Sequence, residues 1–350
     1  MLWRIYRIQY NCVYIHRIIH CRGAPCEKAA CDIGRARQSA VDMNQSGKTN
    51  ADQSLRVDYC KRNPRKSFEK LLDFMPFSLC VREIMRMRVL AEEESLPMPI
   101  LDVGCGDGLF WEVVFSEILR GKEKQLEGLV GIDIDPKEVE LASARLSEFG
   151  SKVESIDIAA KALPGIDDVK MRQKHFNTVI ANCSIEHVPH LKEAISNIRS
   201  LLAPGGRFFV FLPAPMWTET MRTKNILRRF SSRASGVYGS FFDGFFQHHH
   251  LYPYYVWEHL FLGMGFSSVE TKGIGTEVGN GLFEAHLPGA LCEFVAKAVS
   301  GKYPRLQRFR QLGTRGAMFE KFIEQVRQGE IIRQDPSENQ VAEFYIRCVR

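Results

Sequence analysis

Between residues 99 and 213, short apolar runs alternate with segments of helical periodicity, and this order most limits the possible folds. The strand candidates are residues 99–103, 129–134, 152–158, 176–183 and 207–213. Helical patterns fill residues 109–121, 135–150 and 191–202. Short apolar runs are typical of buried parallel strands. Their alternation with helices predicts an α/β fold with a doubly wound, mostly parallel sheet.

Three glycines follow the first strand candidate, in the stretch ILDVGCGDG at residues 100–108. A strand that ends in a glycine-rich turn and opens a helix is typical of nucleotide-type sites, because the backbone can approach a ligand closely. The dinucleotide fingerprint has its third glycine at the sixth position. Here Gly108 stands fifth from Gly104, and Leu109 stands sixth. No Gly-Lys-Ser/Thr follows, so a Walker phosphate loop is excluded as well.

Four stretches in chain order carry a resemblance to a known family. They are ILDVGCGDG, GIDIDPKEVELASAR, IDIAAKALP and FNTVIANCSIEHVPHLKEAISNIRSLLAPGGRFFVFLP. Together they resemble the motifs of class I S-adenosylmethionine-dependent methyltransferases of the small-molecule type, in register over about residues 98–214. Residues 248–270 and 343–350 resemble the family's sixth helix and strand and its seventh strand more loosely. The resemblance implies a seven-stranded Rossmann-like sheet, helical insertions after strands five and six, and S-adenosylmethionine as cofactor.

The resemblance also assigns cofactor contacts. Asp133, at the end of the second strand, matches the acid that binds the ribose hydroxyls, and Asp157 with Ile158 matches the adenine contact. Asp102 and Asp107 are expected near the cofactor's ammonium group. The alternatives are a helix N-terminal role for Asp133 and local turn stabilisation for Asp102 and Asp107. The expected cofactor-binding residues are Asp102, Gly104, Cys105, Gly106, Gly108, Asp133, Ile134, Asp157, Ile158, Asn182 and His187.

Histidines are the candidates for catalysis, since a hydroxyl acceptor needs a base whose pKa lies near neutrality. His248, His249 and His250 lie in an aromatic-rich insertion that is either a substrate lid carrying a base or a packed aromatic segment. His187 follows the fourth strand, where the family commonly has histidine whatever the substrate, so we assign it to the cofactor side or to structure. Adjacent histidines point in different directions, and we therefore expect no metal site.

The domain plan follows from the same patterns. We expect a poorly structured or N-terminal extension over residues 1–62 and a methyltransferase domain over residues 63–350. Within the domain we expect a cofactor core at 98–214, a lid or substrate insertion at 215–257 and a helical insertion at 276–340. The basic opening segment predicts a membrane-surface helix or a transit peptide, and a start of translation at Met43 is the alternative.

The expected reaction is methyl transfer to a small molecule, at a hydroxyl of a sugar, a lipid-linked compound or a natural product. Asn182-Cys183-Ser184-Ile185 replaces the Asn/Asp-Pro-Pro-Tyr/Phe motif of the branch that methylates exocyclic amines or glutamine. The basic residues 216–233 could contact phosphates or an anionic membrane surface, or form a solvated helix face. An RNA or protein methyltransferase and a non-catalytic S-adenosylmethionine-binding protein are the alternative functions.

Composition limits partners and location. The formal net charge of +6 on 350 residues lacks the strong basic excess of a dedicated nucleic-acid binder, so we do not expect nucleic acid as the partner. No uncharged apolar run is long enough for a membrane span, which leaves peripheral membrane contact open. The ten cysteines are spread along the chain and favour free thiols in a reducing cytoplasm over a metal site.

Overall fold

The computed structural model describes residues 54–118, 128–160, 175–246, 248–300, 304 and 307–350. Its centre is an eight-stranded sheet in the order β5-β4-β3-β6-β7-β10-β8-β9. The strands are β3 (Ile100–Val103), β4 (Leu129–Asp133), β5 (Lys152–Ser155), β6 (Phe176–Asn182), β7 (Leu202–Pro213), β8 (Ser268–Ile274), β9 (Ile332–Arg333) and β10 (Glu343–Val349). From β5 to β7 all neighbours are parallel, whereas β10 runs antiparallel to both β7 and β8. The expectation of a Rossmann-like methyltransferase fold is confirmed, and the sheet is mixed, with antiparallel pairs from β7 to β9.

The strand count differs from the seven expected. The additional strand is β9, whose two residues pair antiparallel with Gly273 and Ile274 at the edge of the sheet. A two-residue strand has no period of its own to detect, and its pairing depends on the preceding helices bringing the chain back to β8. The sheet therefore has a short strand covering the edge that β8 would otherwise expose.

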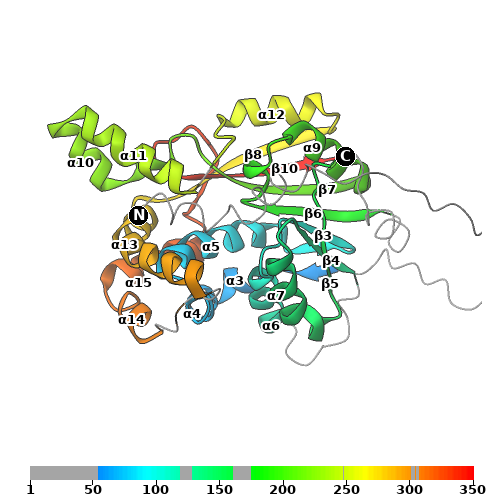
Figure 1. Ribbon diagram of the computed structural model, residues 1–350, viewed down its shortest axis with the longest axis horizontal. Helices are drawn as coiled ribbons and strands as arrows, with labels where there is room; N and C mark the ends of the chain where they lie inside the picture. The colour runs from blue at the N-terminus through cyan, green and yellow to red at the C-terminus, as the bar shows by residue number, and fades with distance from the viewer. Residues whose placement is uncertain (1–53, 119–127, 161–174, 247, 301–303, 305–306) are drawn as a thin grey trace, which may run out of the picture.

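Helices cover both faces of the sheet (Figure 1). One layer contains α3 (Tyr59–Arg62), α4 (Pro64–Leu72), α5 (Phe77–Leu90), α6 (Leu109–Ile118) and α7 (Pro136–Leu146). The other contains α9 (Leu191–Leu201) and α12 (Tyr254–Gly263). Strand β7 shows why both layers form: Phe209 and Phe211 join one hydrophobic core, and Phe208, Val210 and Leu212 join the other. Successive side chains of a strand point to opposite faces, so the continuous apolar run of β7 needs two covers.

The ordered domain begins before residue 63. Strand β1 (Ser54–Arg56) pairs antiparallel with β2 (Ser95–Pro97), and Leu55 and Cys60 are buried in the core next to α5. These residues lie within the range 1–62 that we expected to be an extension. Leu55, Val57 and Cys60 are too few to form a recognisable hydrophobic period, so their packing against the domain could not be predicted from the sequence. Residues 1–53, including Met43 and the basic opening segment, lie outside the described residues.

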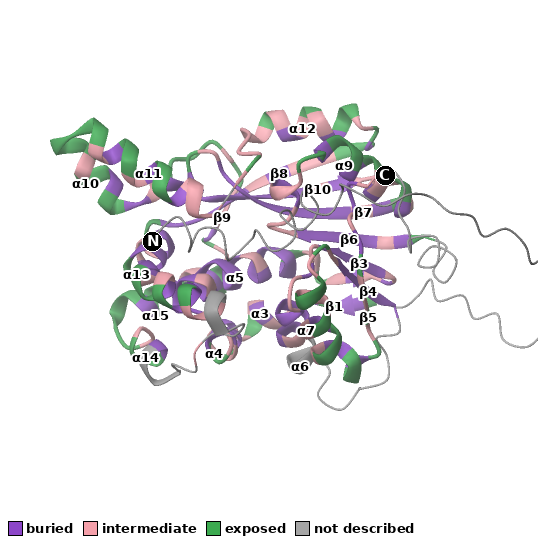
Figure 2. Cartoon of the chain, viewed as in Figure 1, coloured by how far each residue is buried: buried purple, intermediate pink, exposed green. Residues whose placement is uncertain are grey.

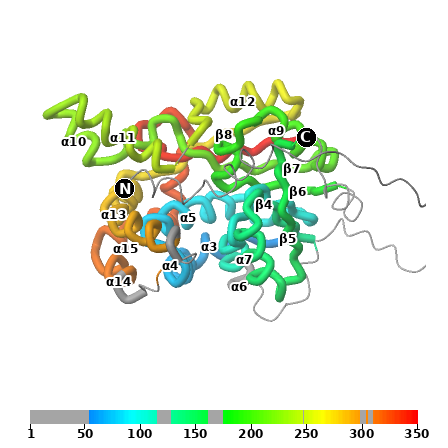
Figure 3. Tube along the Cα trace, viewed as in Figure 1, coloured from blue at the N-terminus to red at the C-terminus, as the bar shows by residue number. Residues whose placement is uncertain are grey.

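Helices follow both β7 and β8 in the chain. After β7 come α10 (Arg222–Phe230) and α11 (Ser232–Phe246), which project from the body; α10 is largely exposed, and α11 is partly buried (Figure 2). After β8 come α13 (Glu277–Ser300), α14 (Gln307–Leu312) and α15 (Ala317–Gln328). These C-terminal helices lie beside α3, α4 and α5, which are far from them in sequence (Figure 3). In the described part of the chain, no helix combines the length and the apolar character needed to cross a bilayer.

Four short 3₁₀ helices complete the described elements. They are η2 (Ala91–Glu93), η3 (Ser147–Phe149), η4 (Ile185–His187) and η5 (Trp217–Thr220). Two of them follow strands at the carboxyl edge of the sheet, since η4 comes after β6 and η5 after β7. Ligands of open α/β sheets bind at this edge, so η4 and η5 lie where an acceptor is expected.

Candidate functional site

The glycine loop connects β3 to α6 and has one open side. Gly104 and Gly106 have φ values of +75° and +53°, which disfavour residues with a side chain. A Cβ at Gly104 would lie 2.3 Å from Cβ of Ser184, whereas a Cβ at Gly106 would meet nothing within 4 Å. Gly104 therefore permits close packing of β3 against the loop after β6. Gly106 presents bare backbone to open space.

The carboxylate of Asp133 lies beside that open side. Its Oδ2 accepts the backbone N–H of Gly106 at 2.9 Å, and its Oδ1 accepts that of Asp135 at 2.9 Å. Burial raises the pKa of Asp133. The helix-capping role that was the alternative for Asp133 belongs to Asp135, which accepts the N–H of Lys137 at the start of α7. The side chain of Ile134 is 42% exposed next to it, which is high for a large apolar residue.

Asp102 lies beneath the loop in β3 and is buried. Its Oδ2 accepts the indole N–H of Trp111 at 2.7 Å, while its Oδ1 has no hydrogen-bond partner among the described residues. Burial raises the pKa of Asp102 to about 7. Asp107 instead accepts the N–H of Leu109 at 3.3 Å and pairs with Arg145 at 3.3 Å. Its contacts are those of the turn-stabilising alternative.

Three other residues predicted to contact the cofactor, Cys105, Asp157 and Ile158, lie close to β4 and β5. Cys105 is buried, and its Sγ lies against Gly131. Asp157 accepts the N–H of Ala159 at 3.0 Å, and the carbonyl of Ile158 accepts from Asn197 at 2.8 Å. These contacts fix the turn that follows β5 at the same edge of the sheet as Asp133.

Taken together, these residues fit S-adenosylmethionine. The open side of Gly106 leaves room for a ligand against the backbone. The Asp133 carboxylate can accept bonds from ribose hydroxyls, the exposed Ile134 offers an apolar surface to an adenine, and the unpartnered Oδ1 of Asp102 can accept from a cationic donor. A cofactor without phosphates needs no lysine in such a loop.

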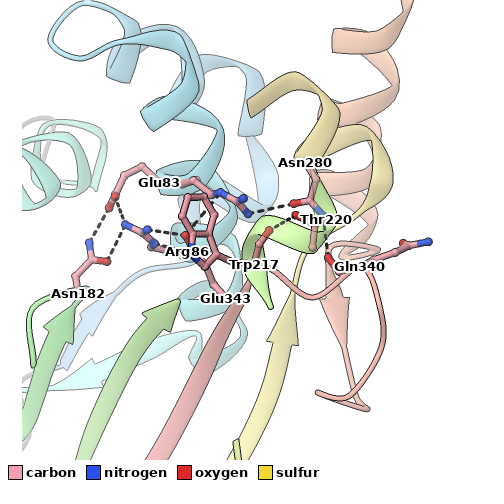
Figure 4. A network of polar contacts seen from close by, with 9 residues as sticks. Glu83, Arg86, Asn182, Trp217, Thr220, Asn280, Gln340 and Glu343 are labelled. Carbon is pink, nitrogen blue, oxygen red and sulfur yellow. Dashed lines mark hydrogen bonds and ion pairs between the residues drawn. The ribbon is translucent and has the colours of Figure 1, made fainter. Parts of the chain in front are cut away.

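Asn182, at the end of β6, belongs to a buried polar network (Figure 4). Its amide donates to Glu83 at 2.9 Å, and its carbonyl oxygen accepts from Arg86 at 3.3 Å. Arg86 also donates twice to Glu343 of β10, at 2.6 and 2.8 Å. The network thus fixes α5 across the ends of β6 and β10. Glu83, Arg86 and Glu343 were not found from the sequence, because residues of a helix and of a strand 257 positions apart share no local motif.

Arg82 extends this network to the C-terminal insertion. It is buried, donates to Asn280 of α13 at 3.1 Å, and lies over the ring of Phe283 at 4.3 Å. Burial lowers the pKa of Arg82 to about 10. Asn280 in turn donates to the carbonyl of Gln340 at 2.8 Å. Through these bonds α5, α13 and the segment before β10 are held together, as Figure 4 shows.

A second polar cluster lies after β6 and consists of Glu186, His187 and His248. The Glu186 carboxylate is fully buried, and neither oxygen has a hydrogen bond among the described residues. His187 Nε2 lies 3.6 Å from Glu186 Oε1, and the rings of His187 and His248 stack at 5.5 Å. Burial raises the pKa of Glu186. Cys183, just before the cluster, has φ +50°, and such backbone strain is often found at functional sites.

The three consecutive histidines point to different surroundings. His248 joins the cluster, and its ring stacks on that of Phe246 and makes an edge contact with that of Trp217. Burial lowers the pKa of His248 to about 3. His249 is exposed. Both ring nitrogens of His250 are occupied, by the Tyr252 hydroxyl at 3.0 Å and by the Val188 carbonyl at 2.9 Å. The structure therefore brings one of the three expected catalytic histidines next to His187. The sequence did not identify Glu186 as a site residue, because the residues next to it in the chain do not indicate that it is buried.

A family model described as a methyltransferase domain matches residues 75–271, which is more than half of the chain. The chain belongs to this methyltransferase family. The family is that of the class I S-adenosylmethionine-dependent methyltransferases, and S-adenosylmethionine is the cofactor. The parallel strands β5-β4-β3-β6-β7 and the glycine loop after β3 lie within the matched residues.

Among curated relatives, the chain is 31% identical over 153 residues to the ubiquinone biosynthesis O-methyltransferase of Dechloromonas aromatica, covering 42% of this chain and 55% of the relative. It is 27% identical over 128 residues to the ribosomal protein L11 methyltransferase of a Geobacter species, covering 37% of this chain and 36% of the relative. The methyltransferase thus spans about half or less of the length of these relatives.

Among solved structures, a Haemonchus contortus phosphoethanolamine N-methyltransferase 2 in complex with S-adenosyl-L-methionine has a TM-score of 0.39 and 13% identity, with 84% of this chain and 59% of that chain covered. An S-adenosylmethionine-dependent methyltransferase from Mesorhizobium loti has a TM-score of 0.37 and 14% identity, with 72% and 91% covered.

Proposed function

We propose that this methyltransferase transfers the methyl group of S-adenosylmethionine to a hydroxyl oxygen of a small molecule, such as a sugar, a lipid-linked compound or a natural product. The observation that carries the proposal is the Glu186–His187–His248 cluster directly after β6. It lies next to the cofactor loop, because Ser184 packs on Gly104. A neutral hydroxyl must lose a proton on methylation, and a cluster of imidazoles and a carboxylate is suited to that task.

The cofactor would be held by the open backbone at Gly106, by Asp133, by Ile134 and by Asp102. When bound, it supplies a methyl group on a positively charged sulfur, which is already electrophilic. The protein's contribution is therefore mainly positioning: aligning the nucleophile with the methyl carbon can provide effective molarities of about 10⁵ M and more. The rigid network of Glu83, Arg86 and Asn182 fixes α5 and the end of β6 for this purpose.

Within the cluster, we propose that the neutral imidazole of His248 orients the acceptor hydroxyl and that the hydroxyl proton passes to solvent, because burial lowers the pKa of His248 to about 3 and makes it a weak base. His249 and His250 were candidates on the same grounds. His250 is less suited, because both of its ring nitrogens are already bonded. The oxygen forms a bond to the methyl carbon as the carbon–sulfur bond breaks, so the products are a methyl ether and S-adenosylhomocysteine.

A cavity of about 590 Å³ supports a small acceptor. It begins at Ala214–Met216, directly after β7, and is also lined by Arg228, Tyr254 and Tyr255. Trp217, the next residue, contacts the ring of His248. The insertion 215–257 thus joins the cavity to the cluster, which agrees with a role as acceptor lid. The cavity volume is in the range of small-molecule sites.

We propose peripheral contact with an anionic membrane through the α10–α11 hairpin, in a reducing cytoplasm where the chain's thiols remain free. Arg222, Ile226, Arg229 and Phe230 share one face of α10 by their spacing. Phe230 is 84% exposed, and Val237 and Phe241 on α11 are exposed as well. Exposed apolar and basic residues together favour a lipid surface over nucleic acid. This supports a lipid-linked acceptor over RNA or protein.

The test is a screen with methyl-labelled S-adenosylmethionine and fractionated small-molecule extract, followed by identification of the labelled product. A methyl ether formed by the wild type and not by Asp133→Ala supports the proposal. Label in RNA or protein would favour the alternative acceptors, and binding of the cofactor without transfer to any fraction would favour a non-catalytic protein.

A further inference from the structure

The Glu186–His187–His248 cluster presents one ligand atom from each residue, and these atoms all lie within 4.8 Å of one another. We propose that the cluster binds one divalent transition-metal ion, and that this ion binds the acceptor hydroxyl. The second part rests on the function proposed above. The first part concerns this chain's residues alone.

The burial of Glu186 indicates that its carboxylate needs a cationic partner. Its carboxylate is fully buried, and both oxygens lack a hydrogen bond among the described residues. Buried carboxylates are normally paired, hydrogen-bonded or bound to a metal. His248 adds a second buried atom of this kind, since its Nδ1 is also without a hydrogen-bond partner in the described chain. A cation between them would satisfy both atoms.

The types of ligand atom in the cluster favour a transition-metal ion. Two imidazole nitrogens and one carboxylate oxygen suit Zn²⁺, Fe²⁺, Co²⁺ and related ions better than Mg²⁺ or Ca²⁺, which favour oxygen ligands. Bond lengths of about 2.0–2.2 Å place the ligand atoms of such an ion roughly 3–3.5 Å apart. His187 Nε2 and Glu186 Oε1 are already 3.6 Å apart. All three ligand atoms lie within 4.8 Å of one another, so binding of an ion requires the imidazole rings to turn inward.

The chain also holds η4 and residues 248–250 together without an ion. The backbone N–H groups of His249 and His250 both donate to the carbonyl of Glu186 at 3.1 Å. The ring of His248 is further enclosed by Trp217 and Phe246. From the sequence we expected no metal, because adjacent histidines diverge. This site uses only one of the three, and takes its other ligands from η4.

Three protein ligands leave an open coordination position, as in catalytic zinc sites. An acceptor hydroxyl bound there would have its pKa lowered by the cation, and its proton would pass to solvent. The resulting oxygen forms a bond to the methyl carbon while the sulfur keeps the electron pair of the broken bond. The overall products remain a methyl ether, S-adenosylhomocysteine and a proton.

The test uses the full chain, freed of metal with a chelator and titrated with Co²⁺ or Zn²⁺. We expect one ion per chain by elemental analysis and a Co²⁺ absorption spectrum typical of nitrogen and oxygen ligands. Glu186→Gln and His248→Ala should weaken binding at least about 100-fold, whereas the nearby exposed His190→Ala should bind as the wild type does. Thermal unfolding of each variant verifies that it is folded.

Two results would overturn the site: no stoichiometric ion on the wild type, or His248→Ala and His190→Ala binding the metal equally well. Should Glu186→Gln fail to fold, His248→Ala and His187→Ala decide the question. Full methyl transfer by the chelated enzyme would refute the metal's role and leave the proposed function intact. Stoichiometric metal binding by an enzyme that methylates no hydroxyl would refute the proposed function and leave the site intact.

Discussion

Oδ2 of Asp133 accepts the backbone N–H of Gly106 at 2.9 Å, so the acid that ends β4 is bonded to the loop that follows β3. This bond places a carboxylate beside bare backbone, at the carboxyl edge of the sheet. It explains why the two features occur together: the acid orients the loop, and the loop holds the acid next to the space in which a cofactor can lie.

Alanine substitutions at Gly106 and Gly104 should have different effects: the first should weaken cofactor binding, and the second should lower the stability of the fold. Gly106→Ala places a Cβ in open space at φ +53°, and we expect it to fold, with about 1–2 kcal/mol lost to backbone strain, and to bind S-adenosylhomocysteine at least tenfold more weakly. Gly104→Ala would place its Cβ 2.3 Å from Cβ of Ser184 and should lower the melting temperature strongly. Calorimetry and thermal unfolding measure both effects. Wild-type affinity in Gly106→Ala would contradict the placement of the cofactor.

The stability of the ligand-free protein should depend on pH through Asp102. Burial raises the pKa of Asp102 from 3.8 to about 7, so over this range the folded chain holds a proton that the unfolded chain has released. The free energy of unfolding therefore falls as pH rises from about 4 to about 7, by up to about 4 kcal/mol for this group.

Asp102→Asn removes this contribution and keeps an oxygen that can accept from Trp111. In urea unfolding, the advantage of the variant over the wild type should grow between about pH 4 and about pH 7 and then stay constant. An advantage that does not change with pH would show that the Asp102 carboxyl titrates normally.

Removing one partner of the buried Arg86–Glu343 pair should be costly. Both side chains are largely buried, and the two bonds between them fix α5 to β10. We expect Arg86→Met to lose about 3 kcal/mol, because it removes both hydrogen bonds to the buried Glu343 carboxylate and leaves it only the longer contact with Arg82, at 3.8 Å. The matched control is Arg65→Met, which breaks an exposed pair with Glu320 and should cost less than about 1 kcal/mol. Equal losses in urea unfolding would contradict the account of this network.

Membrane contact through the hairpin can be measured with vesicles. Wild-type protein should sediment with vesicles that contain phosphatidylserine and much less with neutral phosphatidylcholine vesicles. Phe230→Ser and Arg229→Glu should each reduce sedimentation several-fold. Met318→Ser removes an equally apolar exposed side chain from α15 and should have no effect. Binding that Phe230→Ser leaves unchanged would exclude the hairpin as the contact.

The residues that we propose to hold the cofactor could be named from the sequence because each lies in a short, clear local pattern. Gly104, Gly106 and Gly108 lie in one loop, and Asp133 follows a strand whose apolar run is short and clear. Which of Asp133 and Asp135 caps the helix could not be told until the bonds of each carboxylate were seen.

The acceptor side was not predictable in the same way, because its contacts join distant segments. Glu186 and His248 meet only through the folding of the insertion back onto η4, and Glu83, Arg86 and Glu343 meet only where α5 crosses the sheet. The sequence also could not decide which of three adjacent histidines would turn inward, since packing against Trp217 and Phe246 sets the position of His248.

Calorimetric titration of the folded full chain with S-adenosylhomocysteine tests the central claim most directly, namely that the loop after β3 and Asp133 hold the methyl donor. The account predicts one binding site per chain and at least tenfold weaker binding by Asp133→Ala, because a charged hydrogen-bond acceptor is lost. No binding by the folded wild-type protein, or equal binding by Asp133→Ala, would contradict it.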